Sequence, residues 1–151
     1  MVLRRILAFL AAIVVTEVTI ALVNASSVLA RLVELGVEVP AGLWLQTMAE
    51  DVVGIAPTFL PVLALGFAIA FGVAWAVVRW VLPAGRSFGY PLAGAVCMAV
   101  VLLGLGQIFL THPVAASRSG LGMTMLLACG ALGGWVFLSL LPAPAIDADV
   151  E

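Results

Sequence analysis

The chain has 151 residues, of which six are Arg, eight are Asp or Glu and none is Lys. Hydrophobic residues make up 65% of it and the mean hydropathy is +1.30. Soluble domains are about 45–50% apolar and about 25% charged, so this chain lacks the polar side chains that coat a soluble surface. The composition excludes an ordinary soluble enzyme, a disordered chain and a nucleic-acid binder, and it predicts an integral membrane protein in contact with the lipid bilayer.

Long apolar runs predict four membrane spans within a single transmembrane domain that covers residues 1–151. Each run has about 20 residues or more, which as a helix crosses about 30 Å of hydrocarbon. Backbone amides in lipid must be paired within the segment, and the runs do not alternate as barrel strands do, so the spans are helices. We therefore expect an all-α, four-helix transmembrane bundle with spans at about 6–30, 55–82, 91–110 and 119–141.

The first span has a second interpretation, as a cleaved signal peptide. Arg4 and Arg5 precede a short apolar stretch, and Val28-Leu29-Ala30 offers small residues at which a signal peptidase cuts. Against this, the apolar character resumes after Glu17 and continues to Ala30. A retained helix is the favoured alternative, and the other stays open.

The arginines predict the orientation. Arg4, Arg5, Arg79 and Arg86 fall on one side of the predicted bundle, and Arg31 and Arg118 on the other. By the positive-inside rule, the richer side is cytoplasmic. We expect both termini in the cytoplasm and the protein in an inner or plasma membrane.

The predicted connections differ in character. A tight turn is expected over 82–91 and a short external loop over 111–118, so consecutive spans are antiparallel neighbours. The first external segment, about 31–54, is longer and acidic. Within it, Pro40 could open a short amphipathic helix that lies on the membrane surface, and a plain loop is the alternative.

Small residues and prolines suggest how the helices pack. Ala68, Gly72 and Ala76 recur at a spacing of four in the second span, and Gly130 and Gly134 do so in the fourth. Such residues let helix backbones approach closely, either within one bundle or at a homodimer face. Separately, Pro57 and Pro61 predict a kink or a late helix start at the beginning of the second span.

Glu17 is the ionisable residue that lies deep within a predicted span. It comes 12 residues after Arg5, about 18 Å along a helix, and so lies near the middle of the bilayer. A carboxylate there costs roughly 2.5–3.5 kcal/mol on insertion scales, so Glu17 must be protonated, paired or in a wet cavity.

Other polar residues extend this position into a stripe. Glu17, Asn24, Arg31 and Glu38 recur every seven residues, with Ser27 and Glu34 between them. If the first helix continues to about Leu35, the stripe runs from mid-membrane to the surface, with Gln107 and Thr124 as polar partners on later spans. It predicts either a proton or cation site with Glu17 at its floor, or a neutral Glu17 hydrogen-bonded to fix helix register.

The sequence offers little support for catalysis. His112 is the only histidine, the serines lack a His/Asp arrangement, and Cys97 and Cys129 are small apolar residues rather than metal ligands. We therefore expect no catalytic, cofactor-binding or metal-binding residues. A non-enzymatic accessory or assembly subunit, docked on a membrane-protein partner or on itself as a homo-oligomer, is the first hypothesis. A small proton- or cation-coupled transporter or channel is the alternative, and a lipid-acting enzyme is the least favoured.

Overall fold

The computed structural model describes residues 2–36, 40–80, 86–109 and 115–141, and all of its elements are helical. The elements are α1 (Val2–Glu34), α2 (Ala41–Trp80), α3 (Arg86–Phe109), the short 3-10 helix η2 (Ala115–Arg118) and α4 (Gly120–Leu140). Four helices contain apolar stretches long enough to cross a membrane, at Leu3–Glu34, Phe59–Trp80, Ser87–Gln107 and Gly120–Leu140. The predicted all-α fold with four spans is confirmed, and the chain is a multi-pass membrane protein.

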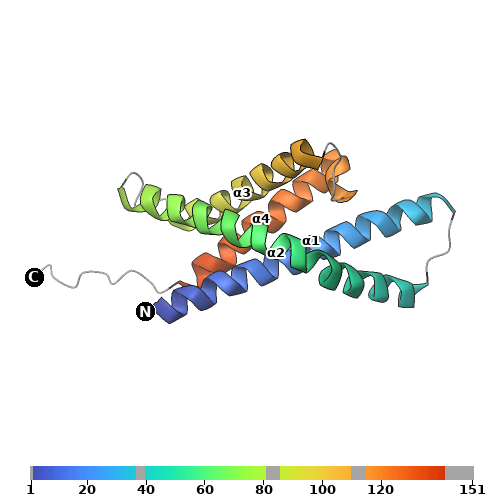
Figure 1. Ribbon diagram of the computed structural model, residues 1–151, viewed down its shortest axis with the longest axis horizontal. Helices are drawn as coiled ribbons and strands as arrows, with labels where there is room; N and C mark the ends of the chain where they lie inside the picture. The colour runs from blue at the N-terminus through green and yellow to red at the C-terminus, as the bar shows by residue number, and fades with distance from the viewer. Residues whose placement is uncertain (1, 37–39, 81–85, 110–114, 142–151) are drawn as a thin grey trace, which may run out of the picture.

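Each long helix runs antiparallel to the next, and the neighbouring pairs are α1 with α2, α2 with α3, α3 with α4, and α4 with α1 (Figure 1). At one end, the Arg4 Nε donates a hydrogen bond to the carbonyl of Leu140 over 3.1 Å, which ties the start of α1 to the end of α4. We call this the Arg-rich end, since Arg4, Arg5 and Arg79 lie there. The opposite, acidic end carries Glu34, Glu50 and Asp51.

The segment over 31–54 contains the end of one helix and the start of the next. α1 continues to Glu34, and α2 begins at Ala41 and runs without interruption to Trp80. The carbonyl of Pro40 accepts the amides of Leu43 and Trp44, so the helix start predicted at Pro40 is right. The helix expected in this segment is thus present, and it continues directly into the second span as part of one 40-residue helix. The plain loop is excluded.

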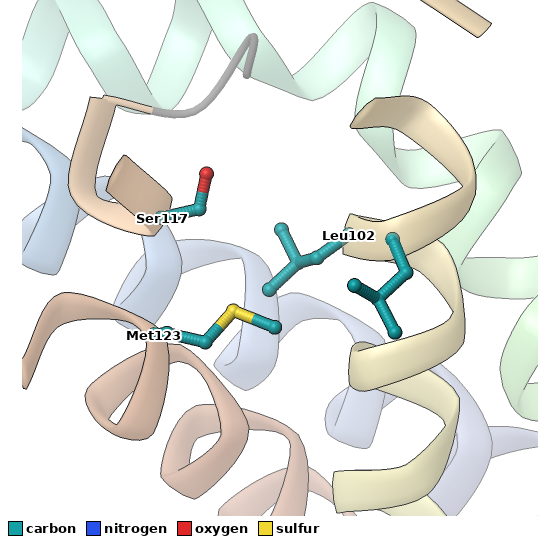
Figure 2. Close-up of a pocket in the computed structure, with 4 residues that line it drawn as sticks. Leu102, Ser117 and Met123 are labelled. Atoms are coloured by element: carbon teal, nitrogen blue, oxygen red, sulfur yellow. The ribbon is translucent and has the colours of Figure 1, made fainter. Parts of the chain in front are cut away.

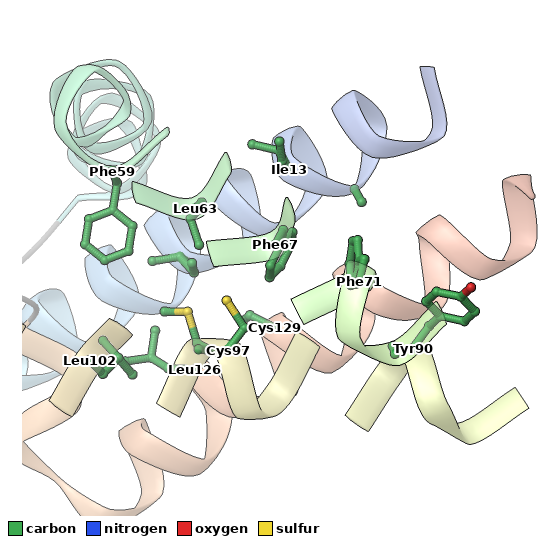
Figure 3. Close-up of a cluster of buried hydrophobic side chains, with 14 of the residues drawn as sticks. Ile13, Phe59, Leu63, Phe67, Phe71, Tyr90, Cys97, Leu102, Leu126 and Cys129 are labelled. Carbon is green, nitrogen blue, oxygen red and sulfur yellow. The ribbon is translucent and has the colours of Figure 1, made fainter. Parts of the chain in front are cut away.

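α2 continues through Pro57 and Pro61 although each proline lacks the backbone donor of one helical hydrogen bond. The packing of Phe59, Leu63 and Phe67, all buried, holds the helix together across this stretch. Figure 3 shows the part of α2 before Phe59 nearly end-on, whereas the part with Leu63 and Phe67 crosses the view. The helix therefore changes direction here, in agreement with the predicted kink, and no late start is needed.

The other boundaries are close to the expected ones. α3 begins at Arg86, five residues before the predicted start at Pro91, so part of the expected turn over 82–91 is helical. Residues 81–85 and 110–114, the latter including His112, lie outside the described residues. The expected loop over 111–118 contains η2, which packs against α1 and α4. Ser119 caps α4 as its hydroxyl accepts the amide of Gly122 at 3.0 Å, and Gly36 ends α1 with a positive φ of 81°.

Aromatic rings from all four long helices fill the half of the bundle nearer the Arg-rich end. The Phe71 ring stacks on Phe137 with 4.4 Å between centroids and lies 4.9 Å from the ring of Phe67. Tyr90 and Phe9 meet Phe71 edge-on at 6.1 and 6.4 Å. We call these five residues the aromatic cluster, and Figure 3 shows Phe67, Phe71 and Tyr90 within the buried core. Such pairs contribute about 0.5–1.5 kcal/mol each beyond the area they bury.

Glycines bring α3 and α4 into backbone contact. A Cβ added to Gly94 would collide with the carbonyl of Gly130, and one added to Gly134 would collide with the carbonyl of Tyr90. Gly130 and Gly134 thus pack within this chain. In contrast, Ala68 and Gly72 of the second small-residue stripe are exposed, a Cβ on Gly72 would meet no atom within 4 Å, and Ala76 is half-buried.

Candidate functional site

Glu17 lies on the buried face of α1, in the middle of the bundle, with 3% of its surface exposed. Its neighbour Thr16 is fully buried and contacts α4, since a Cβ on Gly133 would collide with the Thr16 hydroxyl. Both carboxylate oxygens of Glu17 are buried and have no hydrogen-bond partner among the described residues. Because burial of an unpaired polar group costs free energy, this is the most unusual side chain in the described part of the bundle.

The hydroxyl groups of neighbouring residues on α1 do not donate hydrogen bonds to Glu17. Thr16 donates to the carbonyl of Ala12 at 2.7 Å, and Thr19 donates to the carbonyl of Val15 at 2.8 Å. Each hydroxyl has one proton to donate, and in both cases a carbonyl of the same helix receives it. Hydrogen bonding of Glu17 to fix helix register therefore has no support in this geometry.

Asn24 lies two turns further along the same face of α1 and joins three elements. Its Nδ2 donates to Oδ2 of Asp51 on α2 over 3.0 Å, and its Oδ1 accepts the amide of Ala116 in η2 at 3.5 Å. Asn24 and Asp51 are both half-buried. Since Glu17 and Asn24 are seven residues apart, the same helical face carries the buried acid and this polar junction.

Asp51 was not among the predicted site residues, because an acid near a predicted membrane border is ordinarily solvated. The seven-residue spacing identified the relevant face of the first helix. It gave no information on which residue of the second helix faces Asn24, because the second helix was expected to start after Asp51.

The remaining predicted site residues become more exposed toward the acidic end. Ser27 is half-buried and donates to the carbonyl of Val23 over 2.8 Å, whereas Arg31 is exposed. Glu38 lies outside the described residues. Gln107 and Thr124 are exposed, and the Thr124 hydroxyl donates to the carbonyl of Leu121 in its own helix. The structure thus does not bring Gln107 or Thr124 to Glu17.

Two hollows on the molecule lie away from Glu17. One of about 220 Å³ between α3, η2 and α4 is lined by Leu102, Leu103, Ser117 and Met123, as Figure 2 shows. Another, of about 410 Å³, lies between α1 and α4 and is lined by Leu22, Val23, Ser26, Ser27, Ala30, Leu121 and Met125. Neither contains a titratable lining residue, so neither offers acid–base chemistry.

The chemistry available at Glu17 is therefore proton binding. Among the described residues, no three His, Cys, Asp or Glu side chains gather as metal ligands would. A carboxyl group without a donor or a cation beside it is more stable in a dry interior as the neutral acid than as the anion.

Comparisons of the chain with protein-family models, with curated proteins and with solved structures each return no match.

Proposed function

We propose that the chain is a small, non-enzymatic membrane component that docks on another membrane protein or on a second copy of itself. The supporting observation is the hairpin arm, defined as residues 25–35 at the end of α1 and 41–50 of α2, beyond the junction of Asn24 with Asp51. α1 and α2 have 33 and 40 residues, whereas α3 and α4 have 24 and 21. Figure 1 shows the end of α1 and the start of α2 reaching past the ends of α3 and α4.

α1 is longer than the hydrocarbon core of a bilayer is thick, so the arm extends beyond the core. The apolar stretch Leu3–Glu34 has 32 residues, about 48 Å of helix at about 1.5 Å per residue, against a hydrocarbon core of about 30 Å. Ordinary tilts of up to about 40° do not absorb this difference. The arm therefore brings exposed Val33, Leu35, Leu43 and Leu45 to the membrane surface, where apolar side chains favour a protein partner.

The docking proposal is tested by placing a photoreactive amino acid at Leu35 or Leu45 in the arm, and at Leu65 or Ile69 on the exposed face of the second span as controls. We expect a protein adduct of one defined mass from the arm positions, with lipid adducts from the controls. Recovery of the bare protein at every position would contradict docking through the arm.

We also propose that the Arg-rich end faces the cytoplasm of an inner or plasma membrane, so that both termini lie inside. The support is the excess of arginines at this end, where Arg4, Arg5 and Arg79 lie, over the opposite end, where Arg31 lies. Reporter enzymes active only outside the cytoplasm should be silent when fused after Leu140 and active when inserted at Glu38. The reverse pattern would overturn this orientation.

The buried, unpaired carboxyl group of Glu17 favours a second candidate, a small proton- or cation-coupled transporter or channel. Liposomes that contain the wild-type protein should then show ion or proton flux after a pH jump, and those with the isosteric variant Glu17→Gln should not. Absence of flux at every pH in folded wild-type protein would eliminate this candidate.

A further inference from the structure

The interior of the bundle differs on the two sides of Glu17. Toward the Arg-rich end lies the aromatic cluster, whose rings come from all four long helices. Thr16, Phe67 and Gly133 pack so closely beside Glu17 that a Cβ on Gly133 would collide with the Thr16 hydroxyl and lie 3.1 Å from the Phe67 ring. Such packing leaves no space for a chain of waters between Glu17 and the Arg-rich end.

Toward the acidic end, polar groups follow on the same side of α1. Asn24 and Asp51 form a hydrogen-bonded, half-buried pair at the interface of α1 and α2. Beyond this pair, α1 and α2 diverge in Figure 1, and Leu32, Trp44 and Met48 in these segments are half-buried. The pair is partly exposed, and it lies two helical turns from Glu17. Ile20 and Ala21, both fully buried, are the α1 residues between these two levels on that face.

We propose that Glu17 is a proton-binding site that exchanges protons with the compartment at the acidic end alone, and that in this conformation it binds a proton without passing it across the membrane. The proposal rests on the same buried carboxyl group as the second candidate function but is an alternative to it, because a proton that is bound without passage is not transported. It is independent of docking through the arm. In the binding step a Glu17 carboxylate oxygen takes a proton from hydronium, which leaves a neutral carboxyl group and a water molecule. Release reverses the step.

Few other titratable side chains lie around Glu17 in the bundle. The titratable side chains that the neighbouring helices place toward the interior are Asp51 on α2, Tyr90 and Cys97 on α3 and Cys129 on α4, among the described residues. Tyr90 belongs to the aromatic cluster, on the side of the Arg-rich end. Asp51 is on the route to the acidic end, and it accepts a hydrogen bond from Asn24. The two cysteines are buried and unbridged thiols.

Infrared spectroscopy of protein in liposomes tests the binding itself. At neutral pH the wild-type protein should show the carbonyl stretch of a neutral carboxylic acid. Glu17→Gln should remove this band, whereas Glu50→Gln should keep it, because Glu50 is exposed and bonded to Gln46. A wild-type spectrum without the band, or a band that survives Glu17→Gln, would overturn the proposal.

Substituted cysteines test the side of access. They are introduced into a protein with Cys97→Ser and Cys129→Ser, and circular dichroism checks that each variant keeps its helical fold. A small membrane-impermeant thiol reagent is applied to one side of oriented vesicles with Ala21→Cys, Glu17→Cys or Ile13→Cys. Because Ala21 and Glu17 are buried, we expect slow reaction at positions 21 and 17, from the acidic end only, and none at position 13, which lies beyond Glu17, from either end. Reaction at position 17 from the Arg-rich end, or from neither end, would overturn one-sided access.

Flux separates this inference from the transporter candidate. Retention of the infrared band with no proton flux supports binding without passage and eliminates transport. Flux that depends on Glu17 supports the transporter and overturns the statement that the proton does not pass.

Discussion

A single carboxyl group distinguishes this bundle from a purely structural one. The Thr16 and Thr19 hydroxyls of α1 donate to carbonyls of the same helix, and Asn24 bonds with Asp51 and Ala116. Glu17 has no such partner among the described residues. The folded state therefore bears the cost of one buried polar group, which is the pattern expected where a residue is kept for function rather than for stability.

Replacement of Glu17 by an apolar residue of similar size should stabilise the protein. An unsatisfied buried polar group costs about 1–3 kcal/mol, and Glu17→Met removes it with little change in volume. We expect a gain of that order in the free energy of unfolding, measured by denaturation in detergent micelles. A clear loss of stability would show that the Glu17 oxygens have a partner in solution.

The position of Glu17 could be predicted from the sequence, but its surroundings could not. The count of residues from Arg5 placed it at mid-membrane, and the seven-residue spacing placed Asn24 on the same face. The identity of facing residues depends on how the helices are rotated about their axes, and apolar sequences such as these carry little information on rotation. The expected partners Gln107 and Thr124 are for this reason exposed instead.

The helices pack through two different kinds of contact. α3 and α4 approach through glycines, with Gly94 against Gly130 and Gly134 against Tyr90, because lipid offers no hydrophobic drive for their association. α1 and α2 meet through larger side chains and the bond between Asn24 and Asp51. The two halves of the bundle should therefore respond differently to substitution.

Gly134→Ala and Gly72→Ala form a matched pair that tests the glycine contact. The first places a methyl group against the Tyr90 carbonyl and should destabilise by about 1–3 kcal/mol, as overpacking does. The second places the methyl group in open space and should be neutral or stabilise by up to about 1 kcal/mol, from helix propensity alone. Equal effects in the same denaturation assay would argue against the close approach of α3 and α4.

The bond between Asn24 and Asp51 should appear as energetic coupling. In a double-mutant cycle with Asn24→Ala and Asp51→Ala, we expect a coupling energy of about 0.6 kcal/mol, and at most about 1.7, as found for side-chain hydrogen bonds between membrane helices. Glu50→Ala in place of Asp51→Ala is the control, since Glu50 bonds within its own helix to Gln46. A coupling energy of zero between Asn24 and Asp51 would contradict the hydrogen bond between them.

The four long helices could be predicted because the sequence features that indicate them lie within or next to each helix. Long apolar runs, the Ser119 cap and Pro40 before α2 each set a helix or its boundary. The continuity of α2 was not predictable in this way. Pro57 and Pro61 locally favour a break, and only the tertiary packing of Phe59 and Leu63 holds the helix continuous across them.

At the scale of the whole molecule, the surface explains why the fold needs lipid. Large apolar side chains such as Leu65, Ile69, Leu103 and Trp135 are each 60% or more exposed, so the outside of the bundle carries large apolar groups. In water this surface would aggregate, and in a bilayer it replaces lipid–lipid contacts at little cost. The buried aromatic cluster and Glu17 then lie within the membrane.

The most direct test of this account is extraction of the protein-containing membranes with alkaline carbonate, which strips proteins that do not span the bilayer. We predict that the protein stays entirely in the membrane pellet and is released only by detergent. Release of soluble, monomeric protein by carbonate alone would contradict the transmembrane bundle, and with it the interpretation of Glu17 as an acid held within the membrane.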